Sequence, residues 1–230
     1  MRRVKVKICG ITRIEDLEAA CKAGADMVGF VVNVSSSPRS LSLEKAEDLF
    51  RLVSRNVKSV LVTVPKTLNW IVKAYKRLKP DIIQLHGENI KGYLALKKMI
   101  PNAFLVGAVQ VREGNEFLEK ALEIAEFFDG VLVDSYKIGV YGGTGVIHNW
   151  SVSRRLRDAI YPKPLILAGG LNCQNIKEAI KTVAPYAVDV SSGIEIAPGV
   201  KDHQRMEAFI KAAHEAILED NDYESWRNFV

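Results

Sequence analysis

Two reactive side chains of different type, a thiol and a carboxyl, each end a β-like run of this sequence. Cys9 closes the run 4–9, and Asp134 closes the apolar run 130–134, which a glycine-rich stretch at 141–145 follows. A side chain at the last residue of a strand is how a parallel α/β barrel presents its catalytic groups. A thiol and a carboxyl also suit a base and an acid with separate duties. We therefore predict an enzyme whose chemistry lies at Cys9 and Asp134.

Each of these residues also has an ordinary structural interpretation. A strand cysteine can be a small buried hydrophobe, and an aspartate after a strand can cap a helix or hold a loop. The other cysteines, Cys21 and Cys173, bring the total to an odd number without CxxC spacing. This argues against disulfides or a zinc knuckle and indicates a reducing, cytoplasmic location. The remaining histidines have no ligand spacing, so we expect no metal site. They are His148, His203 and His214.

Strand parity predicts further polar groups on the same inward face. Lys7 shares a strand face with Cys9, because successive side chains alternate. A lysine inside a barrel needs a partner, and the parity of the last β-like run turns Asp189 inward. The first and last strands are neighbours in a closed barrel, so we predict a Lys7–Asp189 ion pair. His86 shares a face with Gln84 on the fourth run, although a hydrogen-bonded core histidine is the alternative.

Two glycine-bearing turns and one arginine suit an anionic ligand. The turns 168–172 and 191–195 follow the seventh and eighth β-like runs, where barrels often bind a phosphate. Glycines let backbone N–H groups approach an anion closely, although each turn alone could be a simple tight turn. The predicted phosphate-binding residues are Gly143, Gly169, Gly170, Ser191, Ser192 and Gly193. Arg39, in the long loop 33–42, either forks onto a substrate carboxylate or is a surface arginine.

The elements that must position these groups alternate regularly along the chain. We predict strands near 4–9, 27–32, 58–64, 81–85, 104–109, 130–134, 164–168 and 187–191. We predict helices near 14–23, 43–53, 67–78, 90–99, 115–128, 151–160, 174–182 and 202–218, with N-caps at Ser42, Thr67 and Ser151. This pattern predicts an α/β protein, a single-domain (β/α)8 TIM barrel over 1–218 with an appendage at 219–230. The alternative, a doubly wound sheet, usually carries a GxGxxG fingerprint after its first strand, which 9–12 is not.

Composition agrees with one globular domain. The chain has 230 residues, of which 48% are hydrophobic and 26% charged, enough for a sizeable core. Lys5 and Lys7 interrupt the apolar stretch a signal peptide needs, and no window approaches the ~18 apolar residues of a membrane span. The net charge is +5, from 32 basic and 27 acidic residues. It indicates either a solvated surface or an electropositive mouth for an anionic small molecule. Lys and Arg do not interleave with aromatics, so we expect no nucleic-acid partner.

Together, stretches along nearly the whole chain resemble the phosphoribosylanthranilate isomerase family, in that family's order. They are 7–12, 24–30, 37–39, 84–87, 133–134, 141–145, 169–172, 188–195 and 201–202. The sequence departs from the family pattern in three places. Val146-Ile147-His148-Asn149-Trp150 stands where Lys, Thr or Ser, Phe and Asp-Trp often follow the glycine loop. The third strand, 61–65, lacks the common Gly-Val-Phe pattern, and Ser40 replaces an aromatic.

The resemblance implies an aldose–ketose type isomerase of tryptophan biosynthesis that acts without cofactor or metal. Its reaction is the Amadori rearrangement of N-(5-phosphoribosyl)anthranilate to 1-(2-carboxyphenylamino)-1-deoxyribulose 5-phosphate. Cys9 matches the family's general base at the sugar C2, and Asp134 matches the general acid at the furanose oxygen. Arg39 matches the residue that holds the anthranilate carboxylate, and the loops at 169–170 and 192–193 match the phosphate site.

The remaining predicted site residues support these roles. We place His86, Lys7 and Asp189 among the substrate-binding residues. A free thiol is mostly protonated at neutral pH, so we expect Lys7 to stabilise the Cys9 thiolate. We also expect burial to raise the pKa of Asp134, so that it holds a proton.

Other assignments remain open at this point. One is another phosphosugar barrel enzyme, such as indole-glycerol-phosphate synthase, with a lysine-dependent site, or the aminoimidazole-carboxamide ribotide isomerase, with two aspartates. A second is a catalytically idle barrel that binds an anionic ligand or a partner protein. Nucleic-acid binding through the basic surface is a third, and it would show a steep salt dependence. The sequence is compatible with a monomer or a homodimer.

Overall fold

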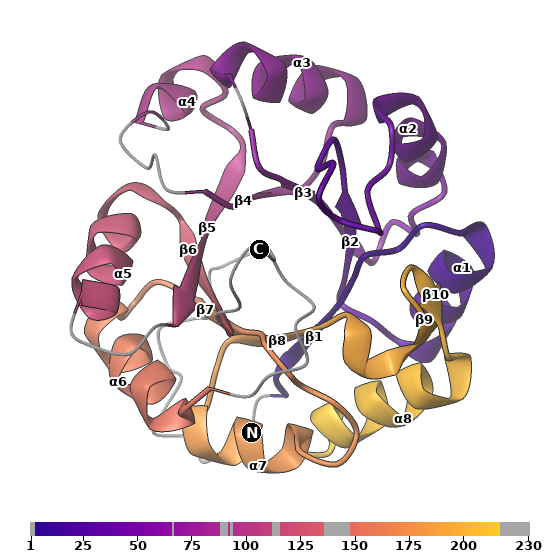
Figure 1. Ribbon diagram of the computed structural model, residues 1–230, viewed down its shortest axis with the longest axis vertical. Coiled ribbons are helices and arrows are strands. Elements are labelled where there is room, and N and C mark those ends of the chain that lie inside the picture. The colour runs from indigo at the N-terminus through magenta and orange to yellow at the C-terminus, as the bar shows by residue number, and fades with distance from the viewer. Residues whose placement is uncertain are drawn as a thin grey trace.

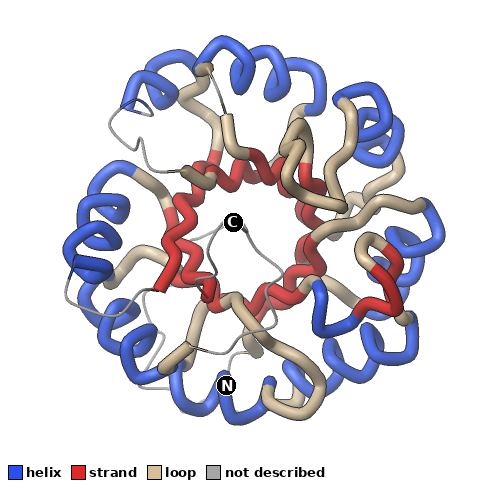
Figure 2. Tube along the Cα trace, viewed as in Figure 1, coloured by secondary structure: helices blue, strands red, loops and turns tan. Residues whose placement is uncertain are grey.

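The computed structural model of the chain is a closed ring of strands surrounded by helices. Figure 1 shows the elements in order around the ring, and Figure 2 separates the inner strands from the outer helices. The structure describes residues 3–65, 67–87, 92, 94–111, 116–135 and 148–216. The predictions for Gly143 and for the appendage at 219–230 lie outside the described residues.

The eight barrel strands are parallel and follow chain order. They are β1 (Lys5–Cys9), β2 (Met27–Val31), β3 (Lys58–Thr63), β4 (Ile82–Leu85), β5 (Phe104–Val111), β6 (Gly130–Ser135), β7 (Leu165–Leu167) and β8 (Ala187–Val190). Because β1 pairs with both β2 and β8, the sheet closes on itself. The predicted TIM barrel is thereby confirmed, and the doubly wound sheet is wrong.

The helices alternate with the strands and cover their outer face. They are α1 (Ile14–Ala23), α2 (Leu43–Arg51), α3 (Leu68–Leu78), α4 (Leu94–Met99), α5 (Glu116–Phe127), α6 (Trp150–Ile160), α7 (Ile176–Val183) and α8 (His203–His214). Strands such as β2 and β6 are buried along their whole length, since helices cover one face and the barrel interior the other. A charged side chain within such a strand needs a partner inside the barrel, because an unpaired buried charge is costly.

Two of the three predicted helix N-caps are correct. The side chains of Ser42 and Thr67 accept hydrogen bonds from the backbone N–H groups of Lys45 and Trp70. The third prediction, Ser151, is wrong, because α6 begins earlier. Its N-cap is Asn149, whose side-chain oxygen accepts a hydrogen bond from the backbone N–H of Ser151.

The segment after β8 contains structure that the sequence pattern did not predict. A short 3-10 helix, η2 (Ser192–Ile194), leads into a two-stranded antiparallel ribbon of β9 (Glu195–Ala197) and β10 (Val200–Lys201). The turn of this ribbon is Pro198-Gly199, and Gly199 has a φ of 81°, which favours glycine. The ribbon turns Glu195 and Lys201 toward the carboxyl end of β1.

Candidate active site

The carboxyl ends of the strands surround a cavity that collects most of the predicted site residues. Among the described residues, its lining includes Cys9, Arg39, His86, Asp134, Gly169, Gly170, Asp189, Ser191, Ser192 and Gly193. Of the predicted set, Lys7 lies in the barrel interior next to Asp189, and Gly143 lies outside the described residues. The chain thus brings its candidate acid, base and anion-binding groups together from several strands, as TIM barrels do.

A buried ion pair lies beneath this cavity. Lys7 Nζ donates to Asp189 Oδ1 over 3.0 Å, and the two residues face each other in the β1–β8 register. Burial favours the uncharged form of Lys7, but the charges of Asp189 and Cys9 outweigh it and raise the pKa of the ammonium group. The predicted Lys7–Asp189 pair is confirmed, and it places one charge of each sign beneath the site.

The thiol of Cys9 lies beside this pair. On the adjacent strand β2, residue 29 is a glycine, and a Cβ there would lie 3.1 Å from both Cys9 Sγ and Lys7 Cε. Burial, followed by the charge of Asp189, raises the pKa of Cys9, while Lys7 and Lys201 lower it by less. Lys7 therefore acts in the predicted direction but does not dominate, and the thiol is protonated at neutral pH.

The carboxyl of Asp134 shows the shift expected of a proton donor. The side chain is buried at the end of β6, and burial and the nearby Asp189 raise its pKa to about 7. The backbone N–H of Ser135 donates to Asp134 Oδ1 over 2.8 Å and opposes part of this rise. At neutral pH about half of the molecules therefore carry a proton on Asp134.

His86 is neutral in this environment. Burial and the charge of Lys7 lower its pKa to about 4. Its Nε2 atom lies 2.8 Å from Gln84 Nε2, on the same inward face as predicted. Gln84 also lines the cavity, and its Oε1 atom is buried without a hydrogen-bond partner among the described residues.

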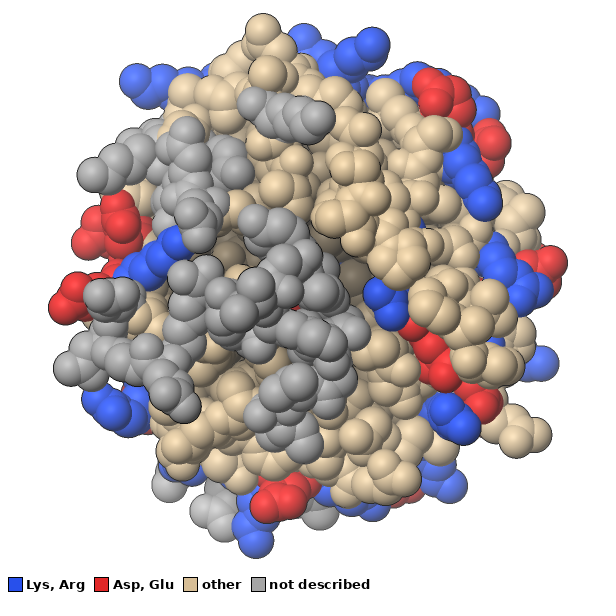
Figure 3. All heavy atoms as spheres, in the orientation of Figure 1, with Lys and Arg blue, Asp and Glu red and all other residues tan. Residues whose placement is uncertain are grey.

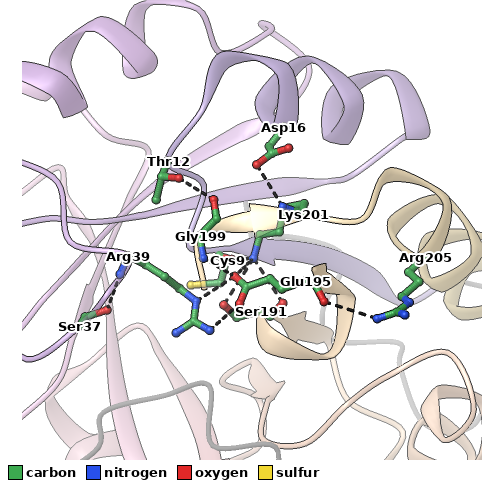
Figure 4. A network of polar contacts seen from close by, with 10 residues as sticks. All are labelled: Cys9, Thr12, Asp16, Ser37, Arg39, Ser191, Glu195, Gly199, Lys201 and Arg205. Atoms are coloured by element: carbon green, nitrogen blue, oxygen red, sulfur yellow. Dashed lines mark hydrogen bonds and ion pairs between the residues drawn. The ribbon is translucent and has the colours of Figure 1, made fainter. Parts of the chain in front are cut away.

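Arg39 extends into the site and is held there by residues that the sequence analysis did not select. Its Nε and Nη2 atoms donate to the two carboxylate oxygens of Glu195 over 2.8 and 2.5 Å. Lys201 Nζ donates to Glu195 Oε1 over 2.8 Å, to the Cys9 carbonyl over 2.6 Å and to the Ser191 carbonyl over 3.3 Å. Figure 4 shows the two cationic side chains meeting at Glu195. The available signal was an acid and a lysine facing each other across a Pro-Gly turn.

The two glycine-bearing turns pack directly against each other. Gly169 and Gly170 have φ values of 87° and 67°, a region that favours glycine. A Cβ on Gly193 would collide with the carbonyl of Leu171, so the second turn reaches the first only because residue 193 has no side chain. The turns after β7 and β8 therefore form one continuous backbone surface along the cavity.

A histidine at a position where the sequence departs from the family pattern links two elements. His148 Nδ1 lies 3.0 Å from Ser135 Oγ, at the end of β6, and its Nε2 lies 2.6 Å from Ser153 Oγ on α6. Burial lowers the pKa of His148 to about 4, so the ring is neutral and bridges the two hydroxyls. The ring thereby connects α6 to β6 one residue from Asp134.

Other features bear on partners. Within the described part of the chain, no group of three His, Cys, Asp or Glu side chains could hold a metal ion. None of its helices combines the length and apolar character needed to cross a membrane. On the face shown in Figure 3, the described Lys and Arg side chains are spread among acidic ones around the rim and form no single-sign stripe.

Comparison with known proteins identifies the family. Residues 6–212 match the family model for N-(5'-phosphoribosyl)anthranilate (PRA) isomerase. The isomerase of Haloferax volcanii is 39% identical to the chain, over 96% of the chain and 97% of that protein. The isomerase of Methanocaldococcus jannaschii is 40% identical, over 90% and 96%. The chain belongs to the phosphoribosylanthranilate isomerase family.

Solved structures of this isomerase family share the fold. The crystal structure of phosphoribosyl anthranilate isomerase from Thermotoga maritima superposes with a TM-score of 0.79 at 36% identity, covering 91% of this chain and 98% of that chain. Membership makes the chain an isomerase of the aldose–ketose type in tryptophan biosynthesis. It also decides against the other phosphosugar barrel enzymes and the idle barrel that the sequence left open.

Proposed function

We propose that the chain catalyses the Amadori rearrangement of N-(5-phosphoribosyl)anthranilate with Asp134 as general acid and Cys9 as general base. One observation carries the proposal: a carboxyl with a pKa of about 7 and a thiol, from different strands, line the same cavity. The carboxyl is half protonated at neutral pH, as a proton donor needs to be. The thiol lies next to Lys7, whose charge favours the thiolate.

The first step opens the sugar ring. Asp134 gives its proton to the furanose oxygen while the C1–O bond breaks. The lone pair of the anilino nitrogen moves into a C1=N bond, so the product is an iminium cation. Burial supports this assignment, because a desolvated carboxyl stays protonated until an oxygen that gains negative charge accepts the proton.

The second step removes a proton from C2. The thiolate of Cys9 takes this proton, the C–H electrons form a C1=C2 bond, and the C=N electrons return to nitrogen. The resulting enolamine becomes the ketone when its hydroxyl loses a proton and C1 gains one, so the overall change is an isomerisation. The iminium charge favours the nearby thiolate and thus assists Lys7 and Lys201.

We assign substrate binding to the anion-binding groups of the cavity. A member of the family has been solved in complex with reduced 1-(o-carboxyphenylamino)-1-deoxyribulose 5-phosphate. In our proposal Arg39 binds the anthranilate carboxylate of the substrate. The turns at Gly169–Gly170 and Ser191–Gly193 bind its phosphate through backbone N–H groups. Neutral His86 and the Lys7–Asp189 pair form the floor of the substrate site. Gly143 remains a predicted phosphate-binding residue.

Location and assembly complete the proposal. Three free cysteines support a cytoplasmic location. The isomerase from Thermotoga maritima is described as dimeric. For this chain, sedimentation at several concentrations decides between the monomer and the homodimer.

The direct test is turnover of the anthranilate adduct by the purified chain without added metal. We expect Cys9→Ser and Asp134→Asn each to lower kcat by about 100-fold or more. Matched controls are Cys21→Ser on α1 and the exposed Asp48→Asn on α2, which should leave kcat unchanged. Turnover that survives both site changes would overturn the acid–base pair while keeping the isomerase.

The pH dependence tests the same pair. The productive form needs protonated Asp134 and a Cys9 thiolate, although the thiol has the higher pKa. Below pH 7, each unit of pH therefore increases the productive fraction. Above about pH 7, loss of the Asp134 proton cancels the gain in thiolate, so kcat/KM levels off. A kcat/KM that is already constant well below pH 7 would contradict the proposal.

A further inference from the structure

The carboxylate of Glu195 uses only part of the hydrogen-bonding capacity of Arg39. A guanidinium carries five N–H donors in one plane. Glu195 accepts hydrogen bonds from Nε and from one N–H of Nη2, which form one edge of the planar guanidinium. This pair leaves the end of the fork, between Nη1 and Nη2, geometrically suited to a second carboxylate. Arg39 itself lines the cavity.

Glu195 is in turn fixed by Lys201. The Lys201 side chain is fully buried, and its ammonium donates to Glu195 Oε1 and to the main-chain carbonyls of Cys9 and Ser191. Glu195 therefore lies between two cations, and its side chain is only 5% exposed. Hydrogen bonds from Arg39 and the charge of Lys201 outweigh burial and lower the pKa of Glu195, so it stays ionised.

We infer that Glu195 is a positioning residue that sets the specificity of the site for a substrate bearing an aromatic carboxylate. It holds the guanidinium plane of Arg39 so that its outer end, which binds no acceptor among the described residues, is presented to the ligand cavity. The cluster of Arg39, Glu195 and Lys201 has two cations and one anion, so one positive charge remains for a ligand carboxylate. Without Glu195 the long arginine side chain has many rotamers, and ordering one of them weakens binding. This inference rests on the proposed role of Arg39.

The substitution Glu195→Gln separates positioning from general structure. A glutamine keeps the size and one acceptor oxygen, which can serve Lys201, but its amide nitrogen then meets the donors of Arg39. The Arg39 guanidinium then keeps only one of its two hydrogen bonds to residue 195, so its plane is no longer fixed. Because a ground-state carboxylate contact also persists in the transition state, we expect KM to rise about tenfold or more while kcat changes by less than about threefold.

Calorimetric binding of two unreactive ligands tests the specificity. One ligand is the reduced carboxyphenylamino-deoxyribulose phosphate held by the relative, and the other is the same compound without its ring carboxyl. We expect the wild type to prefer the carboxylated ligand by about tenfold or more. Glu195→Gln should lose most of this preference and retain its affinity for the carboxyl-free ligand. Glu207→Gln, the same chemical change on the exposed face of α8, is the matched control.

The other outcomes are distinct. An unchanged preference in Glu195→Gln overturns the inference, and so does an equal loss for both ligands, which indicates a merely structural role. If Arg39→Met keeps the preference, the proposed role of Arg39 fails first. If Glu195→Gln does not fold, Glu195→Asp replaces it. Aspartate keeps the charge but is one methylene shorter, so it should also reduce the preference, and an unchanged preference again overturns the inference.

Discussion

The barrel has an upper cavity at the carboxyl ends of its strands and a lower cavity at their amino ends. The two cavities differ in how their surroundings stabilise a charged side chain. The upper cavity measures about 60 Å³ and is lined by the candidate acid and base. The lower one is larger, about 180 Å³, with walls such as Phe104, Val106 and Ile166. Volume alone would select the lower cavity as a ligand site. Among the described residues, however, the groups suited to proton transfer converge on the upper one.

Two aspartates make the contrast concrete. Burial disfavours the charged form of both. At the lower end, His214, the backbone N–H of Val6 and Lys5 outweigh burial and lower the pKa of Asp26 to about 2. At the upper end, the nearby Asp189 adds to burial and raises the pKa of Asp134 to about 7. A buried carboxyl becomes an acid catalyst when its neighbours fail to satisfy its charge, and a structural anchor when they do.

The largest expected effect compares two lysine–aspartate pairs. The buried pair Lys7–Asp189 contrasts with Lys58–Asp81, whose side chains are 43% and 37% exposed. Removal of one partner from a buried pair leaves an uncompensated charge, so Lys7→Met should lower the free energy of unfolding by about 3–5 kcal/mol. Lys58→Met should cost less than about 1 kcal/mol. Urea unfolding at pH 7 measures both, and equal costs would contradict the contrast.

The same Lys7 change tests the thiolate. Above the plateau that begins near pH 7, kcat/KM should fall once the pH exceeds the pKa of the Cys9 thiol. Since Lys7 lowers that pKa, its loss should move this fall to higher pH. An unchanged profile, measured on the folded variant, would show that Lys7 does not act on the thiol.

A smaller effect on stability is expected for Asp134→Asn. This substitution should stabilise the fold although it lowers kcat. The folded-state pKa of about 7 lies above the unfolded value of 3.8, so the native state loses stability as pH rises through this range. Asp134→Asn removes that penalty. The variant should be more stable than the wild type by about 2–4 kcal/mol at pH 8 and by much less at pH 4. Guanidinium unfolding at the two pH values provides the test, and a less stable variant at pH 8 would reject the assigned shift.

Asp26 should behave in the reverse way and with the smallest effect of the three. Its folded pKa, about 2, lies below 3.8, so its contribution is present above pH 4 and is lost as pH falls toward 2. We expect Asp26→Asn to lower stability by about 1–3 kcal/mol at pH 7 and to leave kcat within about twofold. A large loss of turnover in the folded variant would show that the lower end participates in catalysis.

Features that follow a simple geometric rule were predictable from the sequence. Strand alternation and barrel closure suffice to pair Lys7 with Asp189, and strand ends suffice to bring Cys9 and Asp134 to one cavity. The N-cap of α6 was missed because Asn149 and Ser151 are both good caps, and only the backbone decides between them. Glu195 was missed because its contact with Arg39 joins the loop after β2 to the β9–β10 ribbon, two segments far apart in the chain.

Balances between opposing effects were harder to predict. The sequence indicates that Lys7 favours a thiolate at Cys9, but the size of the opposing burial depends on every group packed around the sulfur. Burial is the largest single effect on both Cys9 and Asp26, but only at Asp26 do the hydrogen-bond partners together outweigh it. The direction of such a shift requires the packed structure.

The position of Lys201 has a thermodynamic consequence for the barrel as a whole. Its ammonium group bridges the carbonyl of Cys9 on the first strand and that of Ser191 after the last, which is the seam where the ring closes. The same Lys201 ammonium therefore holds β1 to the segment after β8 and fixes Glu195 beside the ligand cavity. By linkage, a ligand that orders Arg39 and Glu195 also stabilises this seam. Amide hydrogens along β1 and β8 should then exchange more slowly when the site is occupied, while those of β4 and β5, across the ring, change less.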